Sequence, residues 1–203
     1  MLIKDFQVGQ LETNCYIVTD ENTLECAVID PGDEANTILD YLEDNKLKCR
    51  FIFLTHGHYD HTMAVAEIAE ETGAKVCIHE NDTKARLDNA PYAYCPPDGS
   101  ILYSEGSKMR VGSLEFTVLE TPGHSRGSVT LMCENALFTG DTLFRDNCGR
   151  VDLPGGSMNE MYKSLERLAR LPGDYEVYPG HMDSTTLERE RRFNYYIDLA
   201  MNN

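Results

Sequence analysis

The segment His56-Gly57-His58-Tyr59-Asp60-His61 constrains the fold more than any other feature of this chain of 203 residues. An apolar run, Arg50–Leu54, precedes it, and a helical pattern over Thr62–Glu71 follows it. In an extended segment, the first two histidines and the aspartate point to one side, and the last histidine points elsewhere. A lone histidine at a strand end is typical of a solvated loop. A dense run of nitrogen and oxygen donors instead predicts a site for two neighbouring metal ions.

Three later motifs repeat one arrangement, in which an apolar strand ends and a glycine-flanked donor follows. They are Thr121-Pro122-Gly123-His124, Phe138-Thr139-Gly140-Asp141 and Tyr178-Pro179-Gly180-His181. Glycine beside each donor lets the backbone turn and approach a shared centre closely. Loops at strand ends are also where α/β folds place their functional groups. Each motif alone is typical of an ordinary turn, but together with the first segment they contain all but one of the histidines, which favours a metal site.

The remaining sequence alternates between batches of strands and intervening helices. Hairpin-forming sequence over Ile101–Leu119 excludes a purely parallel sheet, and a last helix is expected over Leu187–Met201. This order fits two mixed sheets with helices outside. No linker or internal repeat divides the chain, so we expect one α/β domain over residues 1–203. The turn-rich stretch from about Thr83 to Gly99, which contains Tyr92 and Tyr94, is expected to form a surface loop with a short helix.

Charge and cysteine content narrow the classes of partner and compartment. The chain has 18 Lys and Arg against 34 Asp and Glu, a net charge of −16. Nucleic acids and anionic membranes both require a basic surface, so we expect neither as a partner. No apolar stretch is long enough to span a bilayer, and the N-terminal residues lack the apolar core of a secretory signal. Seven cysteines, an odd number without a C-x-x-C pair, predict reduced thiols and a cytoplasmic location.

These motifs, in this order, resemble the metallo-beta-lactamase superfamily, in the branch of glyoxalase II (hydroxyacylglutathione hydrolase) and related small hydrolases. The resemblance covers essentially the whole chain, including the segments Val28–Gly32 and Gly149–Gly156. It implies an αββα sandwich of two mixed sheets with outer helices and a two-metal site between the sheet edges. Glyoxalase II also has a C-terminal helical extension that helps to hold glutathione. The sequence continues only a short way past His181, so we do not expect that extension, and the use of glutathione stays open.

The resemblance assigns metal ligands position by position. The first metal ion would be held by three histidines: His56, His58 and His124. The second would be held by one aspartate and two histidines, with a further aspartate bridging both ions: Asp60, His61 and His181, then Asp141. All seven donors are nitrogen or oxygen, which suits two divalent metal ions. We expect Zn²⁺ first, with Fe²⁺ or Mn²⁺ as alternatives.

The implied activity is hydrolysis of a small anionic thioester by a hydroxide that bridges the two metal ions. Asp141 and Asp60 would act in catalysis, Asp60 by orienting the hydroxide. Arg150 would bind the anionic group of the substrate, and its structural alternative is an ion pair with Asp146 or Asp152. Asp30 is expected to support the site from a turn.

Other functions remain open on the same residues. Persulfide dioxygenases share this fold and a segment similar to Cys148–Asp152, but they use one iron, for which the ligands here would be His56, His124 and Asp141. A lactone or ester hydrolase and a non-catalytic metal-binding protein are further alternatives, although structural metal sites are usually closed and rich in cysteine. We expect Cys148 to be a buried thiol, and assign no role to Met182.

Overall fold

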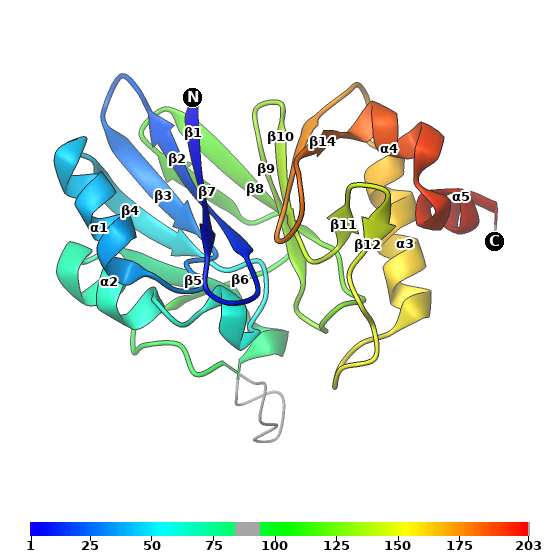
Figure 1. Ribbon diagram of the computed structural model, residues 1–203, viewed down its shortest axis with the longest axis horizontal. Coiled ribbons are helices and arrows are strands. Elements are labelled where there is room, and N and C mark those ends of the chain that lie inside the picture. Colours follow the sequence, from blue (N-terminus) through cyan, green and yellow to red (C-terminus); the bar gives the residue numbers. More distant parts are fainter. Residues whose placement is uncertain (84–93, 203) are drawn as a thin grey trace.

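The computed structural model describes residues 1–83 and 94–202. Two six-stranded sheets face each other, and helices cover the outer face of each (Figure 1). Each sheet contains both parallel and antiparallel pairs. The prediction of an αββα sandwich of two mixed sheets is therefore confirmed. Tyr92 lies outside the described residues, as does most of the segment expected to contain a short helix.

The first sheet combines an antiparallel and a parallel half, in the order β1-β2-β3-β4-β5-β6. Its strands are β1 (Leu2–Val8), β2 (Thr13–Asp20), β3 (Glu25–Ile29), β4 (Lys48–Phe53), β5 (Lys75–His79) and β6 (Ile101–Tyr103). Strands β1 to β3 pair antiparallel, and β3 to β6 pair parallel. The carboxyl ends of β3, β4 and β5 therefore lie at one edge of the sheet. Two helices, α1 (Ala35–Asp44) and α2 (Val65–Thr72), cover its outer face (Figure 1).

The second sheet has the order β14-β13-β10-β9-β8-β7. Its strands are β7 (Lys108–Val111), β8 (Leu114–Glu120), β9 (Val129–Cys133), β10 (Ala136–Gly140), β13 (Glu176–Pro179) and β14 (Thr185–Thr186). A short ribbon of β11 (Leu143–Phe144) and β12 (Asn147–Cys148) follows β10. The helices on this side are α3 (Met158–Ala169), α4 (Leu187–Phe193) and α5 (Tyr195–Asn202). Strands β10 and β13 are parallel, so their carboxyl ends also meet at one edge.

Alternation along the strands explains why both faces of each sheet are buried. In β3, Cys26 and Val28 pack toward α1 and α2, whereas Ala27 and Ile29 pack toward the second sheet. Successive side chains of a strand point to opposite faces, and a sheet covered on both faces needs apolar residues at both sets of positions. The same holds for the other central strands, and it fixes the edge at which their loops emerge.

Two sequence-based expectations about elements are wrong. Ile101–Tyr103 does not join the hairpin: it forms β6, parallel to β5, with Cys77 opposite Ile101. Strands this short carry too little pattern to name their partner. The expected last helix is also two helices, because Asn194 has an extended backbone between α4 and α5. The Asn194 side chain accepts from the backbone N–H groups of Tyr196 and Ile197, and so caps α5.

No helix in the described part of the chain combines the length and the apolar character that a membrane crossing requires.

Candidate metal centre

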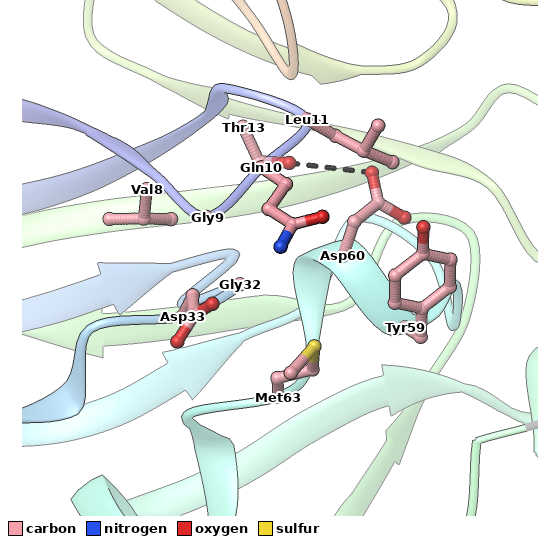
Figure 2. A pocket seen from close by; sticks show the side chains of 10 residues that line it. All are labelled: Val8, Gly9, Gln10, Leu11, Thr13, Gly32, Asp33, Tyr59, Asp60 and Met63. Atoms are coloured by element: carbon pink, nitrogen blue, oxygen red, sulfur yellow. Dashed lines mark hydrogen bonds between the residues drawn. The ribbon is translucent and has the colours of Figure 1, made fainter.

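The loop after β4 carries four of the predicted ligands and is not extended along its length. Tyr59–His61 forms a 3₁₀ turn, in which the His61 N–H donates to the His58 carbonyl at 3.1 Å (Figure 2 shows Tyr59 and Asp60 on this turn). The turn places Asp60 beside His61 and His181 rather than beside the two preceding histidines. The expectation that Asp60 lies on the same side as His56 and His58 is therefore wrong. Because the turn starts directly after His58, the loop divides its donors into two pairs.

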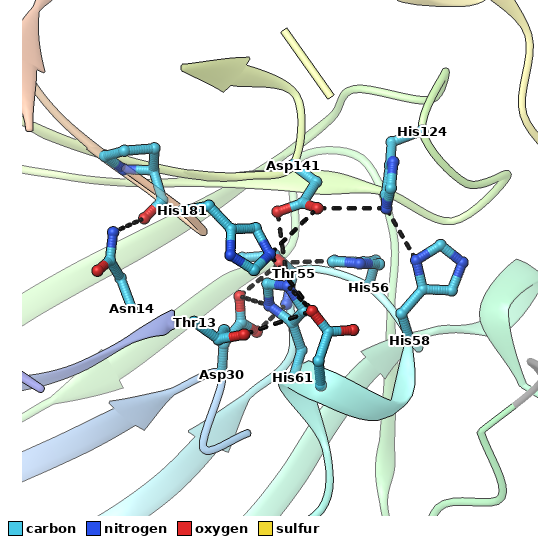
Figure 3. A network of polar contacts seen from close by, with 12 residues as sticks. Thr13, Asn14, Asp30, Thr55, His56, His58, His61, His124, Asp141 and His181 are labelled. Carbon is cyan, nitrogen blue, oxygen red and sulfur yellow. Dashed lines mark hydrogen bonds and ion pairs between the residues drawn. The ribbon is translucent and has the colours of Figure 1, made fainter. Parts of the chain in front are cut away.

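All seven predicted ligands nevertheless converge between the two sheets (Figure 3). They follow the carboxyl ends of β4, β8, β10 and β13. Three groups of donor atoms have all members within 4.8 Å of one another, and two of them consist only of predicted ligands. The third joins Asp30 to His56 and His61. We call His56, His58 and His124 the first group, and Asp60, His61 and His181 the second group.

The first group consists of three buried imidazoles, and two of them have a lowered affinity for protons. His58 Nδ1 lies 2.8 Å from His124 Nε2. Burial, and then the neighbouring histidines, hold the pKa of His56 well below its usual value. The same causes, burial first and then His124, lower the pKa of His58 to about 4. Neutral imidazole is the form that binds a metal ion, so His56 and His58 are already in their ligating form at neutral pH.

The second group mixes imidazole and carboxylate, and the pKa values of its two imidazoles are raised rather than lowered. Burial opposes protonation of His61, but the charges of Asp141 and Asp30 outweigh it and raise its pKa to about 9. Burial also opposes protonation of His181, whose pKa is raised by its contact with Asp60. For Asp60, burial favours the neutral acid, yet the hydrogen bond from His181 and the charge of His61 lower its pKa. A cation entering here would displace protons from these imidazoles.

Asp141 lies between the two groups. Its Oδ2 is 3.4 Å from His124 Nε2 in the first group and 3.6 Å from His181 Nε2 in the second. Its Oδ1 is 3.5 Å from His61 Nε2. One carboxylate therefore faces both groups, as a residue bridging two metal ions must.

Unpaired polar atoms show that these residues fit metal ions. Within the described residues, three buried side-chain atoms lack a hydrogen-bond partner: His56 Nε2, His61 Nε2 and Asp141 Oδ1. Leaving a buried donor or acceptor unsatisfied costs about 1–3 kcal/mol, so a cluster of such atoms calls for an explanation. All three belong to the convergent set, and each offers a lone pair to a divalent cation, His61 once its proton has been displaced. The donor set contains no thiolate, which suits a catalytic rather than a closed structural site.

Asp30 fixes the orientation of two of the histidines. It follows β3 with a left-handed backbone (φ 51°) and accepts from the Thr55 N–H at 2.8 Å and the Thr55 hydroxyl at 2.6 Å. Its Oδ2 also accepts from His61 Nδ1 at 3.0 Å, and His56 Nδ1 lies 3.1 Å from the Thr55 hydroxyl. In both rings Nδ1 is thus engaged, and Nε2 faces the centre. Asp30 has the supporting position expected for it, because its oxygens are occupied by these partners.

Two side chains at the start of β2, Asn14 and Tyr16, hydrogen-bond to the segment around His181, and the sequence did not predict these contacts. We call this set of hydrogen bonds the clamp. The Asn14 side chain donates to the carbonyls of Pro179 (3.0 Å) and Met182 (2.8 Å), on either side of His181. The Tyr16 hydroxyl donates to the same Pro179 carbonyl at 2.7 Å. These bonds join the first sheet to the loop after β13. Only the polar side chains in the apolar run of β2 hinted at such a role.

The sequence also did not predict that Asp82 supports the loops of the centre. Asp82 lies in the short 3₁₀ turn after β5 and is buried. Its carboxylate accepts from the backbone N–H groups of Gly57 (2.9 Å) and Gly127 (2.7 Å), and from the Ser125 hydroxyl (2.6 Å). No motif in the sequence singles out Asp82, which lies just before the stretch from about Thr83 to Gly99 that was expected to form a surface loop.

The structure places the other predicted residues around the centre as follows. The Arg150 guanidinium donates to both oxygens of Asp152 at 2.7 Å, and both side chains are exposed. This ion pair with Asp152 is the structural alternative that was expected for Arg150. Binding of a substrate anion by Arg150 stays a prediction. The Arg150 carbonyl does contact the first group, at 2.7 Å from His124 Nδ1. Cys148 is buried, as expected, and burial raises the pKa of its thiol to about 11.

Comparison with known proteins is consistent with this geometry. The profile of the metallo-beta-lactamase superfamily matches residues 8–181. The chain belongs to the metallo-beta-lactamase superfamily. An uncharacterized protein of Aquifex aeolicus (strain VF5) is 40% identical, with both chains covered over their full length. The hydroxyacylglutathione hydrolase of Shewanella baltica (strain OS185) is 36% identical over 82% of this chain, which spans 60% of that protein.

Solved structures of the superfamily have the same fold and differ in their named functions. BLEG-1, a B3 metallo-beta-lactamase, superimposes with a TM-score of 0.86 at 30% identity, covering 97% of this chain and 99% of that one. ETHE1 from Myxococcus xanthus gives 0.84 at 29% identity, covering 100% and 91%. TTHA1623 in a di-iron-bound form gives 0.82 at 35% identity, covering 96% and 100%. Membership of the superfamily and the clustered donors together show a metal-binding protein of hydrolase-like architecture.

Proposed function

We propose that this protein is a hydrolase that uses two divalent metal ions, Zn²⁺ first among the candidates, to cleave a small thioester. The observation that carries the proposal is the pair of donor groups with Asp141 facing both. A mononuclear site needs only one such group. The similarity to a hydroxyacylglutathione hydrolase supports the reaction class, and the di-iron form of TTHA1623 supports a binuclear centre.

In this proposal the first group would hold one cation and the second group the other, and Asp141, which faces both groups, would serve both. Bound cations would supply Lewis acidity, which lowers the pKa of a water molecule and polarises the substrate carbonyl. The reaction adds water across the C–S bond: a C–O bond forms, the C–S bond breaks, and the departing sulfur receives a proton. No serine or cysteine nucleophile is required.

The chain's own residues would orient the reactants. Asp60 Oδ2 accepts from the Thr13 hydroxyl at 3.3 Å and lies 3.3 Å from His181 Nε2, which fixes the carboxylate. Its other oxygen is then able to accept a proton from a water molecule in the centre. Arg150 would bind an anionic group of the substrate after exchanging its exposed partner Asp152 for that group. Exposed ion pairs are worth about 0–1 kcal/mol, so the exchange costs little.

We further propose a cytoplasmic setting for this activity. All seven cysteines are free, and six of them are buried. Free thiols in the core are stable in a reducing compartment and need no oxidised partner.

Metal analysis combined with kinetics tests the proposal. Anaerobically purified protein should contain two divalent ions per chain and hydrolyse thioesters. Asp141→Asn should lose metal and at least about 10²-fold in kcat/KM, because one carboxylate serves both groups. Asp183→Asn is a matched control, since Asp183 is exposed and pairs only with Arg145 among the described residues. Asp141→Asn with both metals and full activity would refute the bridging role.

A persulfide dioxygenase remains the second candidate. It would need His56, His124 and Asp141 alone, and the 3.4 Å approach of His124 Nε2 to Asp141 is compatible with such a set. One iron per chain together with persulfide-dependent oxygen uptake, and no thioester turnover, would favour it over the hydrolase.

A further inference from the structure

A pocket opens beside the second group and is not used by the metal ligands other than Asp60. It has a volume of about 250 Å³ and lies between the β1–β2 turn and the 3₁₀ turn after β4 (Figure 2). Water occupies about 30 Å³ per molecule in the liquid, so the pocket accommodates part of a small substrate. Because Asp60 forms one wall, a group bound here is adjacent to the centre.

The walls of this pocket are apolar and acidic. Val8, Leu11, Tyr59 and Met63 supply apolar surface, and the last three are largely exposed to solvent. Exposed apolar side chains gathered around a concave site mark a binding surface. The carboxylic acids on the described walls are two aspartates, Asp33 and Asp60, and no lysine, arginine or histidine accompanies them.

We infer that this pocket binds an apolar, uncharged part of the substrate, and that an anionic group of the same substrate must lie elsewhere. The inference rests on the proposed hydrolase function. A carboxylate placed here would face Asp33 and Asp60 and lose its hydration without gaining a cationic partner. An alkyl or aryl group would instead cover Leu11 and Met63. The substrate is thereby oriented, with its apolar part beside the second group and any anionic part toward Arg150.

Matched thioesters test this orientation. The N-acetylcysteamine thioesters of hexanoic and adipic acid differ only in a terminal methyl or carboxylate on the acyl side. The hexanoyl thioesters of N-acetylcysteamine and of 3-mercaptopropionate differ in the charge of the thiol side. In at least one pair we expect the neutral member to have about tenfold higher kcat/KM. Equal values in both pairs would overturn the inference.

A charge introduced at the rim should change this preference. Met63→Lys should reduce the ratio of neutral to anionic kcat/KM at least about threefold in the discriminating pair. Leu102→Lys is the matched control: Leu102 is 55% exposed, against 60% for Met63, but lies on β6 and does not line the pocket. An equal response of the two variants would overturn the inference.

A binding measurement separates failure of the pocket from failure of the proposed reaction. With methyl-labelled methionine, hexanamide should shift the Met63 resonance of the metal-loaded protein, and adipamate, which adds a carboxylate, should do so only at much higher concentration. If Met63 shows this difference between the two compounds but the protein hydrolyses no thioester, the proposed reaction is refuted and the proposed apolar pocket is supported. Equal shifts by both compounds would refute the pocket whatever the reaction.

A second inference concerns Asp82, and different observations carry it. The geometry points to Asp82 as the residue that positions the first group. Its partner Gly57 lies between His56 and His58, and its partner Ser125 directly follows His124. One buried carboxylate therefore joins the two loops that supply every member of that group. The second group has no such contact with Asp82 among the described residues.

The contacts are tight enough for this role. A Cβ on Gly57 would lie 2.8 Å from the Asp82 carbonyl, and one on Gly127 would lie 2.7 Å from Asp82 Oδ1. The loops thus approach Asp82 as closely as glycine permits. The Asp82 carboxylate also interacts electrostatically with His58, a member of the first group, where it would partly balance the charge of a cation.

Metal titration distinguishes positioning from a general structural role. Asp82→Asn should weaken Co²⁺ binding to the first group about 10- to 100-fold and leave the second group unchanged. His58→Ala and His181→Ala identify which step of the titration belongs to which group. Asp20→Asn is the matched control, since Asp20 is equally buried and accepts two backbone N–H groups and two hydroxyls at the opposite end of the fold. Equal weakening of both steps, or wild-type binding by Asp82→Asn, would overturn the inference.

Discussion

Substituting Gly180 by alanine should disable the metal centre while leaving the fold intact. Gly180 immediately precedes His181; its N–H donates to the Gly140 carbonyl at 2.9 Å and its carbonyl accepts from the Asn14 N–H at 2.7 Å. These two bonds fix its position between the sheets. An added Cβ would collide with Asp141 Oδ1 and lie 2.8 Å from His61 Cε1. One methyl group therefore meets a ligand of the second group and the aspartate that faces both groups.

The expected magnitude follows from these distances. Ordinary contact begins near 3.4 Å, so His61 or the loop must move by at least several tenths of an ångström, and Asp141 by more. Overpacking of this kind costs about 1–3 kcal/mol in the free energy of unfolding. A displacement near 1 Å at reacting groups costs about 10²-fold in rate. We therefore expect Gly180→Ala to fold, to bind metal more weakly and to lose about 10²-fold in kcat/KM.

The assay compares Gly180→Ala with Gly173→Ala. Gly173 has a left-handed backbone (φ 83°) and no heavy atom within 4 Å of its added Cβ. Alanine there costs about 1–2 kcal/mol through backbone strain alone. Thermal unfolding should thus show similar losses for both variants, while metal content and turnover fall only in Gly180→Ala. Full metal content and activity in Gly180→Ala would refute the placement of Asp141 and His61 around this glycine.

Three further predictions concern other contacts. The hydrogen bond from the Ser113 N–H, with further donors, lowers the pKa of Asp20 to about 2, so the stability it contributes is present above about pH 4 and lost as pH falls toward 2. Denaturant unfolding should therefore show Asp20→Asn less stable than wild type at pH 7, and the difference in free energy of unfolding should shrink between pH 4 and 2. A difference that does not change with pH would contradict this. Tyr16→Phe should cost about 1 kcal/mol and weaken binding to the second group, because the Pro179 carbonyl loses a buried donor; unchanged metal titration would exclude the clamp. Arg150→Ala should raise KM for anionic thioesters and leave kcat nearly unchanged. An unchanged KM would contradict a role for Arg150 in binding the anionic group.

The identity of the donors and their location at strand ends are readable from the sequence because both depend on local features. Apolar runs of strand length precede each donor, and a glycine beside the three later ones permits close approach. The carboxyl ends of parallel strands lie at the same edge of a sheet, whatever the order of the strands in that sheet. The convergence of His124, Asp141 and His181 with the first segment follows from that rule and from the resemblance to the superfamily.

The grouping of those donors was decided by tertiary structure. The alternation rule placed Asp60 with the first two histidines, but the 3₁₀ turn over Tyr59–His61 moves it into the second group. Local pattern also could not predict the pairing of β6, because its three residues are too few to indicate that β5 is the neighbouring strand. Asn194 ends α4 because its side chain bonds to the carbonyls of Phe144 and Asn147, far away in the sequence.

The sequence alone therefore determined which donor side chains stand at the strand ends and come together between the sheets, since residue type and local strand pattern are sufficient for that. It left unassigned the residues that hold those side chains in place. Asp82 connects two loops separated by 68 residues between Gly57 and Ser125, and Asn14 reaches a carbonyl 165 residues away. Hydrogen bonds of this range leave no local pattern, because their partners become neighbours only when the two sheets pack face to face.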